Sequence, residues 1–453
     1  MEGLGYARAQ MGLSLAFHIV FAAVGVALPV LLVVAELRWR RTRDRDYLEL
    51  AKRLAKGTGI LFAVGAVSGT VLSFELGLLW PRFMGTFGEA IGLPFALEGF
   101  AFFTEAIFLG IYLYGRGRVS ERFHLFSAVA VAASGAASAF FVTLVNAFMN
   151  DPAGVVETTR SARLGFEPLR AMWSPSWPFE TVHVLLSCYQ ATAWAMVGIH
   201  ALFLLRDPRR SLHRKALGVA LPIACLTALV QPLSGDRSAK HIALAQPSKL
   251  AAAEALMRTT RAAPLHVGGW PDPKTGEIRG AVSIPGGLSF LAHGDPRSIV
   301  IGLDQTAPAD RPPVVATRQA FQVMVGAGTA MAAIAAVAGA VALRRRRRSP
   351  SVDGAAWPQP LLVALVGASP LGFVALEAGW LVTEWGRQPW IVRGYLRTAE
   401  AVTSFPYKAA PFWLFTLVYL FLGVAVAYLL GKQIVAAHRA GDAPEAGGPA
   451  RAE

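Results

Sequence analysis

Two acidic residues lie inside one of the most apolar stretches of the chain. The stretch "LEGFAFFTEAIFLG" runs from Leu97 to Gly110, contains no lysine or arginine, and carries Glu98 and Glu105. Their spacing is nearly two turns of an α-helix, so both carboxyl groups are expected on one helix face. Acidic side chains in such surroundings are costly and commonly form proton relays or cation sites. We therefore predict one of these two functions; the alternative is that each glutamate only hydrogen-bonds a neighbouring helix.

Four more side chains that can ligate iron lie in apolar stretches. They are His18 in "LSLAFHIVF", His183 in "FETVHVLLS", Met324 in "FQVMVGAG" and Glu377 in "ALEAGW". Histidine and methionine are haem-iron ligands, and a His/Met pair suits a low-spin electron-transfer haem. The chain has no CxxCH motif, so a haem would be held without a thioether link. Taken singly, a histidine or methionine in a helix is more often a packing residue.

The elements that must position these residues are membrane helices. Of the 453 residues, 54% are hydrophobic and only 16% are charged, which is less charge than soluble domains carry. Backbone groups in hydrocarbon must be paired within their own segment, so apolar runs of about 20 residues are expected to be helices. We predict an all-α integral membrane protein with a bundle of nine transmembrane helices. The spans lie near residues 11–36, 57–79, 94–114, 123–148, 181–205, 216–233, 319–343, 360–383 and 410–431.

The net charge of +14 is explained by topology rather than by nucleic-acid binding. Basic runs follow alternate spans: "RWRRTRDRD" after the first, "RDPRRSLHRK" after the fifth and "RRRRR" after the seventh. This is the positive-inside pattern, which places the N-terminus outside and the C-terminus in the cytoplasm. It predicts contact with lipid and no nucleic-acid partner. It also places all the candidates in the outer half of the bilayer, which favours one shared buried site: His18, Glu98, His183, Met324 and Glu377.

The predicted spans divide the chain into four parts. Residues 1–233 hold the first six helices, and residues 318–437 hold the last three. Residues 234–317 form a long extracytoplasmic connection between the sixth and seventh helices, and loops of this length are usually functional or disordered. Residues 438–453 are predicted to be a disordered cytoplasmic tail. Cys188 and Cys225 lack metal-ligand spacing and are predicted to be buried free thiols.

Several motifs together resemble subunit I of the cytochrome bd quinol oxidases over nearly the whole chain. They are "FHIVFAAVGVALPVLL", "LEGFAFFTEAIFLG", "LVNAFMNDP", "QPSKLAAAEA", "FQVMV" and "EAGWLVTEWGRQPW", within which "GRQPW" is the most specific. The resemblance implies a terminal respiratory oxidase of the bacterial inner membrane. Such an enzyme oxidises quinol at the outer face and reduces dioxygen to water with cytoplasmic protons. It generates proton motive force without pumping.

The resemblance also implies cofactors, partners and residue roles. Subunit I carries a low-spin haem b, a high-spin haem b, and a third haem that is either d or b. It assembles with a subunit II; a small single-helix subunit and the choice between ubiquinol and menaquinol stay open. His183 and Met324 match the axial ligands of the low-spin haem. His18 and Glu377 match ligands of the two high-spin haems, without deciding which residue binds which haem.

Further residues match positions around these haems and along the substrate paths. Glu98 matches an acid beside the oxygen-reducing haem and is a candidate ligand. The remaining matches are Glu105 and Asn146 on a proton path, Trp380 near the high-spin pair, and Lys249 and Glu254 at quinol-linked positions. Arg387 of "GRQPW" is either a turn cap or a partner of haem propionates, which favour guanidinium groups.

Three features of the sequence bear on the residue roles that the resemblance implies. Lys249 and Glu254 lie in a segment expected to face solvent, where an ordinary surface pair is the alternative. Gln322 stands where the family usually has an arginine, two residues before the methionine, so the charge near the low-spin haem is expected to differ. The connection also lacks the long insertion that some relatives carry.

Two other functions stay open on sequence alone. A proton- or cation-coupled transporter would place an ion on Glu98 and Glu105, but it predicts inverted repeats and broken helices that are not clear in the sequence. A haem-binding homologue with lost oxygen reduction is the second alternative. The presence of His18, Glu98 and Glu377 together counts against that loss.

Overall fold

The computed structural model describes residues 2–157, 164–272, 276–348, 357–404 and 409–440. Within these residues, nine helical segments are long and apolar enough to cross a membrane. Each predicted span lies inside one of them, so the bundle prediction is confirmed. The segments are α1 (Glu2–Thr42), α2 (Arg45–Leu79), α3 (Pro81–Gly115), α4 (Glu121–Asn150), α6 (Trp177–Arg206), α7 (Ser211–Ala245), α10 (Val314–Arg348), the pair α11 (Gln359–Ala368) and α12 (Leu371–Arg387), and α14 (Ala409–Ala440).

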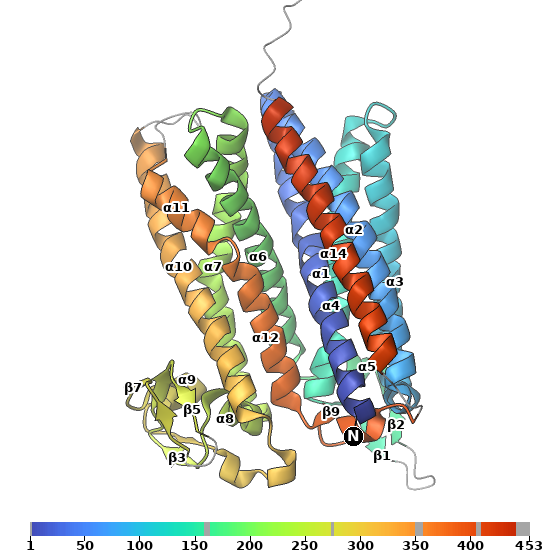
Figure 1. Cartoon of the computed structure of the whole chain (residues 1–453), viewed down its shortest axis with the longest axis vertical. Coiled ribbons are helices and arrows are strands. Elements are labelled where there is room, and N and C mark those ends of the chain that lie inside the picture. Colours follow the sequence, from blue (N-terminus) through green and yellow to red (C-terminus); the bar gives the residue numbers. More distant parts are fainter. Residues whose placement is uncertain (1, 158–163, 273–275, 349–356, 405–408, 441–453) are drawn as a thin grey trace, which may run out of the picture.

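The long helices run side by side in two groups (Figure 1). One group contains α1–α4 and α14, and the other contains α6, α7, α10, α11 and α12. Helix α6 joins the groups because it packs against α1 and α4 as well as against α7, α11 and α12. Aromatic side chains on α3 and α14 face outward, including Phe100, Phe103 and Phe421, as expected for surfaces in contact with lipid or another membrane subunit.

Short elements gather at one end of the bundle, together with the N-terminus (Figure 1). In this end region each strand pair is antiparallel: β3 with β8, β4 with β7, β5 with β6, β1 with β2, and β9 with β10. The strands are β1 (Val155–Glu157), β2 (Leu164–Phe166), β3 (Thr260–Arg261), β4 (Leu265–Val267), β5 (Trp270–Pro271), β6 (Ile278–Arg279), β7 (Val282–Ile284), β8 (Ile299–Val300), β9 (Trp390–Val392) and β10 (Leu396–Arg397). The short helices are α5 (Pro168–Met172), α8 (Pro247–Glu254), α9 (Gly287–His293) and α13 (Thr398–Ala401), with the 3-10 turns η1 (Leu303–Gln305) and η2 (Pro308–Asp310).

The sixth helix and the tail differ from the expected boundaries. Helix α7 continues through Pro222 and Pro232 to Ala245, so the connection begins at Gln246 rather than at residue 234. The connection has a small core of its own, formed by α7, α8, α9 and β8 side chains such as Leu250, Leu288 and Val300. The C-terminal helix reaches Ala440, and the rest of the predicted tail lies outside the described residues.

The eighth span is broken next to a close helix contact. Helix α11 ends at Ala368, and Pro370 precedes α12. At this break α6 approaches closely through Gly198, where a Cβ atom would lie 2.1 Å from that of Ser369. A Cβ atom on Gly372 would lie 2.5 Å from the Cα of Ala191. Small residues therefore set how near α12 lies to α6, as is common in membrane bundles.

Candidate functional site

Helix α3 presents Glu98 and Glu105 toward α4, as the spacing predicts. The Ser138 hydroxyl donates a 2.8 Å hydrogen bond to Glu98 Oε1. One turn along α4, Gly135 faces Glu105: a Cβ atom there would lie 3.4 Å from Glu105 Oε2 and 3.3 Å from the Gly25 carbonyl of α1. The Glu105 side chain is only 6% exposed. The two acids thus share one face of α3 but have different surroundings.

The hydrogen bonds of His18 leave one ring nitrogen suited to iron. His18 Nδ1 lies 2.9 Å from the Ser68 hydroxyl oxygen of α2. The Ser68 hydroxyl also lies 2.9 Å from the Val64 carbonyl, which can take its one hydrogen; in that arrangement Ser68 accepts from His18 Nδ1–H. Nε2 then keeps its lone pair, which is the arrangement of a metal-ligating histidine held by a partner on its other nitrogen.

His183 and Met324 come from opposite sides of the α6–α7–α10–α12 group. The His183 ring contacts Gln231 and Ser234 of α7, with Nε2 lying 3.2 Å from the Gln231 amide nitrogen. Met324 of α10 lies against Gly379 of α12, where a Cβ atom would lie 3.0 Å from the sulfur. A larger residue at position 379 would therefore displace this sulfur.

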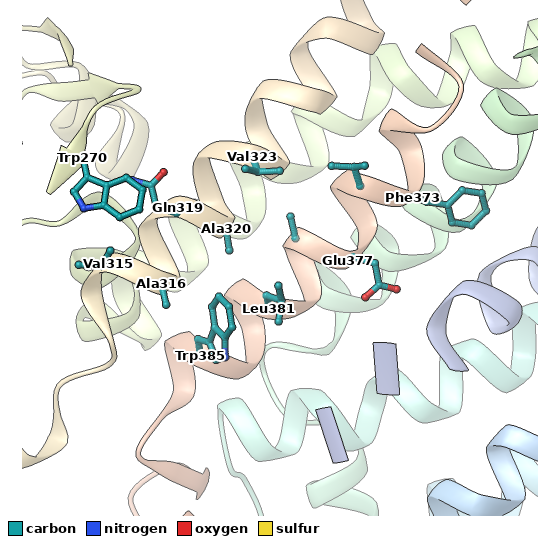
Figure 2. A pocket seen from close by; sticks show the side chains of 12 residues that line it. Trp270, Val315, Ala316, Gln319, Ala320, Val323, Phe373, Glu377, Leu381 and Trp385 are labelled. Atoms are coloured by element: carbon teal, nitrogen blue, oxygen red, sulfur yellow. The ribbon is translucent and has the colours of Figure 1, made fainter. Parts of the chain in front are cut away.

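Glu377 has a buried carboxyl oxygen without a partner. Its Oε1 accepts no hydrogen bond from the described residues. The side chain is among those that line an open cavity of about 790 Å³ along α10 and α12, together with Trp270, Gln319 and Trp385; its carboxylate points away from α10 (Figure 2). Buried polar atoms are nearly always paired, so this unpaired carboxylate oxygen fits a ligand that binds beside it. Trp380 lies half-buried on the next turn of α12.

One core cluster connects the helices that carry His18, His183 and Glu377 with α4, whose Ser138 bonds Glu98. The cluster contains residues close in sequence to His18, His183 and Glu377, and Ala139, which is next to Ser138. Its members include Ile19, Ala23, Ala139, Val184, Leu185, Phe373 and Leu376. These four candidates therefore lie around a common region of the bundle, whereas Met324 on α10 is outside this cluster. An imidazole with a free Nε2, a thioether and an unpaired carboxyl group form a donor set that fits haem iron. Cys188 and Cys225 are free, as predicted; Cys188 is buried, whereas Cys225 is only partly buried.

At the connection end, a chain of hydrogen bonds runs from α8 to α12. Lys249 Nζ donates to Asn150 Oδ1 at 3.0 Å, and Asn150 Nδ2 donates to Asn146 Oδ1 at 2.8 Å. Asn146 Nδ2 then donates to Glu384 Oε1 at 3.2 Å. Arg387 Nη2 completes the chain with a 2.6 Å bond to Glu384 Oε2. Two membrane helices, α4 and α12, thereby meet α8 at the start of the connection around Lys249, Glu384 and Arg387.

Two further observations concern the ends of this chain. Burial lowers the pKa of Lys249 to about 8, while the nearby Glu180 carboxylate acts in the opposite direction. Nε and Nη1 of Arg387 have no partner among the described residues. The Arg387 side chain lines a second, smaller cavity of about 170 Å³ with Lys249 and Arg393. Its unpaired nitrogens fit a carboxylate-bearing group such as a haem propionate.

The expectation that Lys249 and Glu254 face solvent is wrong. Their side chains are 4% and 3% exposed, and they have separate partners. Lys249 bonds Asn150 of α4, whereas Glu254 forms an ion pair with Arg318 of α10, with 3.6 Å between Oε2 and Nη1. Burial raises the pKa of Glu254 to about 7, and Arg318 opposes that shift. Distant helices supply the partners, which the local sequence does not show.

Asn146 does not lie beside Glu105. Gly135, which contacts Glu105, precedes Asn146 on α4 by about 16 Å of helix rise. Asn146 instead belongs to the chain that begins at Lys249.

Sequence reasoning missed four polar residues of this region: Asn150, Glu180, Arg318 and Glu384. The available signal was that three of them, Glu180, Arg318 and Glu384, are charged residues directly next to a predicted span. Glu180 precedes His183 by one helical turn, and Arg318 is an isolated arginine at the start of the seventh span. Glu384 precedes Arg387 by one turn and pairs with it.

Comparison with known proteins agrees with this arrangement. The family model for cytochrome bd terminal oxidase subunit I matches residues 6–438. A Bacillus subtilis protein provisionally named cytochrome bd menaquinol oxidase subunit I is 36% identical, over 95% of this chain and 96% of its own. The Escherichia coli K12 cytochrome bd-II ubiquinol oxidase subunit 1 is 26% identical, over 94% and 95%. The solved bd oxidase of Geobacillus thermodenitrificans superposes with a TM-score of 0.87 at 38% identity, covering 96% of this chain and 99% of that one.

The matches span the membrane bundle and the connection alike. They support a multi-pass protein of the bacterial inner membrane that acts as a respiratory quinol:dioxygen oxidoreductase. Haem cofactors, a quinol substrate and a subunit II partner follow from the same family. An ion-coupled transporter is thereby excluded. The chain belongs to the cytochrome bd terminal oxidase subunit I family.

Proposed function

We propose that quinol is oxidised at the connection end of the bundle, facing the outside, and that dioxygen is reduced nearby with protons from the cytoplasm. The observation that carries this proposal is the hydrogen-bond chain from Lys249 to Arg387. It joins the connection to α12, the helix that also carries Glu377. The basic runs lie at the other end of the bundle, which the positive-inside rule assigns to the cytoplasm.

The proposed haem-holding residues lie in the same half of the bundle. His183 and Met324 would hold a low-spin haem b, and His18 and Glu377 would hold two high-spin haems, the third group being haem d or b. When bound, haem supplies electron transfer and the iron at which dioxygen binds and is reduced to water. Arg387 would neutralise propionate charge through Nε and Nη1, which have no partner among the described residues.

The chain's own acids would move the protons. Each quinol gives up two electrons and two protons, and Glu254 is placed to accept a proton at the connection end. Glu105 would hold a proton on its way from the cytoplasm, and Glu98 would deliver it near the oxygen-reducing site. Because the released and consumed protons are on opposite sides, the reaction would generate proton motive force without pumping.

Spectroscopy of the purified complex tests the haem assignment. A reduced-minus-oxidised spectrum should show b-type bands, and mass spectrometry of extracted haems should distinguish haem d from a third haem b. Absence of haem absorbance would refute the proposal. Low-spin haem without a carbon-monoxide-reactive haem would favour the alternative, a homologue that has lost oxygen reduction.

Sidedness and partners need separate measurements. In proteoliposomes of known orientation, quinol oxidation should acidify the connection side while oxygen reduction takes up protons from the other side. Parallel assays with ubiquinol and menaquinol analogues should identify the substrate. Mass spectrometry of the intact complex should show subunit II and, as we propose, a small single-helix subunit.

A further inference from the structure

Arg318 is the most deeply buried charged side chain at the connection end. It lies one turn into α10 and is 0% exposed. A guanidinium group that is removed from water without partners carries a large free-energy cost. Its burial therefore implies that the surrounding groups have been arranged to receive it.

The partners of Arg318 come from two separate segments of the connection. Nη1 donates to the Glu254 carbonyl at 3.1 Å and lies 3.6 Å from the Glu254 carboxylate. Nη2 donates to the carbonyls of His266 at 3.0 Å and Gly268 at 2.8 Å. Glu254 is the last residue of α8, so Arg318 also satisfies a carbonyl that the helix end leaves unpaired.

Two neutral side chains of α10 bond the same segment of the connection, at Gly268 and Gly269. Gln322 accepts a hydrogen bond from the Gly268 N–H at 2.8 Å, and Gln319 donates to the Gly269 carbonyl at 3.1 Å. The next residue, Trp270, lines the large cavity (Figure 2). Gln322 follows Arg318 by one turn on the same face, yet it is neutral. Arg318 therefore supplies the positive charge at this contact.

The charge of Arg318 acts on Glu254 specifically. Among the described residues, Arg318 is the charged side chain that pairs with the Glu254 carboxylate. The other charged side chains nearby have partners elsewhere: Asp304 on η1 bonds Thr259, and Arg387 on α12 bonds Glu384. Arg318 bonds the backbone carbonyl of His266, and burial together with the Arg318 charge lowers the pKa of His266. Glu254 Oε2, the oxygen that faces Arg318, has no hydrogen-bond partner among the described residues. Arg318 favours the ionised carboxylate against the effect of burial, and the ionised form is the one that can accept a proton.

We propose that Arg318 is a positioning residue for quinol oxidation: it pairs with the Glu254 carboxylate and holds residues 266–269 against α10. This rests on the proposed role of Glu254 at the quinol site. The family usually has an arginine at position 322, two residues before Met324. In this chain the positive charge is instead on Arg318, one turn nearer the connection and beside Glu254.

The test compares Arg318→Gln, Arg318→Lys and the double variant Arg318→Gln/Gln322→Arg in the purified complex. Steady-state rates with a short-chain quinol analogue are measured across pH, next to oxygen reduction driven by an artificial donor that reduces haem directly. Limited proteolysis reports how firmly the connection is held. Arg311→Gln is the matched control, because Arg311 also holds a connection carbonyl, that of Thr306 at 2.9 Å, but does not touch Glu254.

Arg318→Gln should lower kcat/KM for quinol about tenfold or more, by removing a charge-assisted contact and the ionised acceptor. Without the cation the pKa of Glu254 rises further, so the rise of activity with pH should shift to higher pH. Arg318→Lys should keep the wild-type pH profile with a raised KM. The double variant should regain part of the activity, because residue 322 reaches the same His266 carbonyl.

Three results would overturn the inference. One is an unchanged pH profile and kcat/KM in Arg318→Gln. A second is an equal shift in Arg318→Lys and Arg318→Gln, which would show that charge is not the cause. Equal loss of donor-driven activity and haem absorbance in all the Arg318 variants would assign Arg318 to folding and also refute it. Wild-type protein without quinol oxidation would instead refute the proposed function itself.

Discussion

Lys249 and Asn150 are separated by 99 positions in the chain, and the Lys249 ammonium group donates a 3.0 Å hydrogen bond to the Asn150 side-chain oxygen. This contact attaches the first turn of α8 to the end of α4. It also begins the hydrogen-bond chain that reaches Arg387. Gly386 makes the approach feasible, because a Cβ atom there would lie 2.6 Å from Lys249 Cγ.

Replacing Lys249 with Met should flatten the pH dependence of stability. Burial lowers the pKa of Lys249 to about 8 in the folded protein, whereas an unfolded lysine titrates near about 10.4. Between these values the unfolded chain binds more protons, so the wild-type free energy of unfolding rises with pH, by about 3 kcal/mol at most. Well below pH 8 Lys249 is protonated in both the folded and the unfolded protein, so it no longer makes the free energy of unfolding depend on pH. Thermal unfolding of the complex from pH 7.5 to 10 measures the difference.

The matched control for this change is Lys240→Met. Lys240 is partly exposed and pairs with Asp236 one turn away on α7. Its removal should leave the wild-type pH slope. Parallel pH curves for wild type and Lys249→Met would show that Lys249 does not lose its proton early.

Replacing Glu105 with Gln should slow oxygen reduction at least about tenfold while haem content stays constant. The amide keeps the shape of the buried side chain but cannot pass a proton. Oxygen consumption and the haem spectrum are measured on the same preparation. Thr104→Ala is the control, since Thr104 is exposed on the same helix and bonds only its own backbone in the described contacts. Wild-type turnover in Glu105→Gln would remove this residue from the proton path.

Replacing Glu98 with Ala should change the absorbance of a high-spin haem, because Glu98 is proposed to lie beside it. Ser138→Ala removes the donor that orients the Glu98 carboxylate and should give a smaller change of the same kind. Ser127→Ala serves as the control on α4, because the Ser127 hydroxyl bonds only the Phe123 carbonyl among the contacts described. Spectra that are identical for wild type and Glu98→Ala would place this glutamate away from haem.

Replacing Gly372 with Ala should destabilise the bundle by about 1–3 kcal/mol or more, because the new Cβ would lie 2.5 Å from the Ala191 Cα. Neither backbone can move aside without separating α12 from α6. Thermal unfolding followed by haem absorbance reports the loss. Gly367→Ala is the matched control, since a Cβ atom at Gly367 meets nothing within 4 Å. Equal stability of the two variants would contradict the close packing seen at the break.

Much of the fold could be predicted from hydrophobic runs because backbone groups in hydrocarbon must be paired locally. That rule fixed the nine spans without any knowledge of packing. The same rule did not predict the last part of α7. The predicted span ends at residue 233, whereas the helix continues through polar sequence to Ala245. A helix beyond the hydrocarbon has no hydropathy signal, and here it is stabilised by packing against α8 and α9.

The shared face of Glu98 and Glu105 was likewise readable from the sequence, because helical periodicity alone decides it. The environments of Lys249 and Glu254 were not. Their spacing suggested a surface pair, but each is buried against a partner 99 or 64 positions away. Charge and helix register are local properties of a chain. Which charges meet, and how far water is excluded around them, is decided only when distant helices pack together, and that packing is what gives Glu254 and Arg318 their common site.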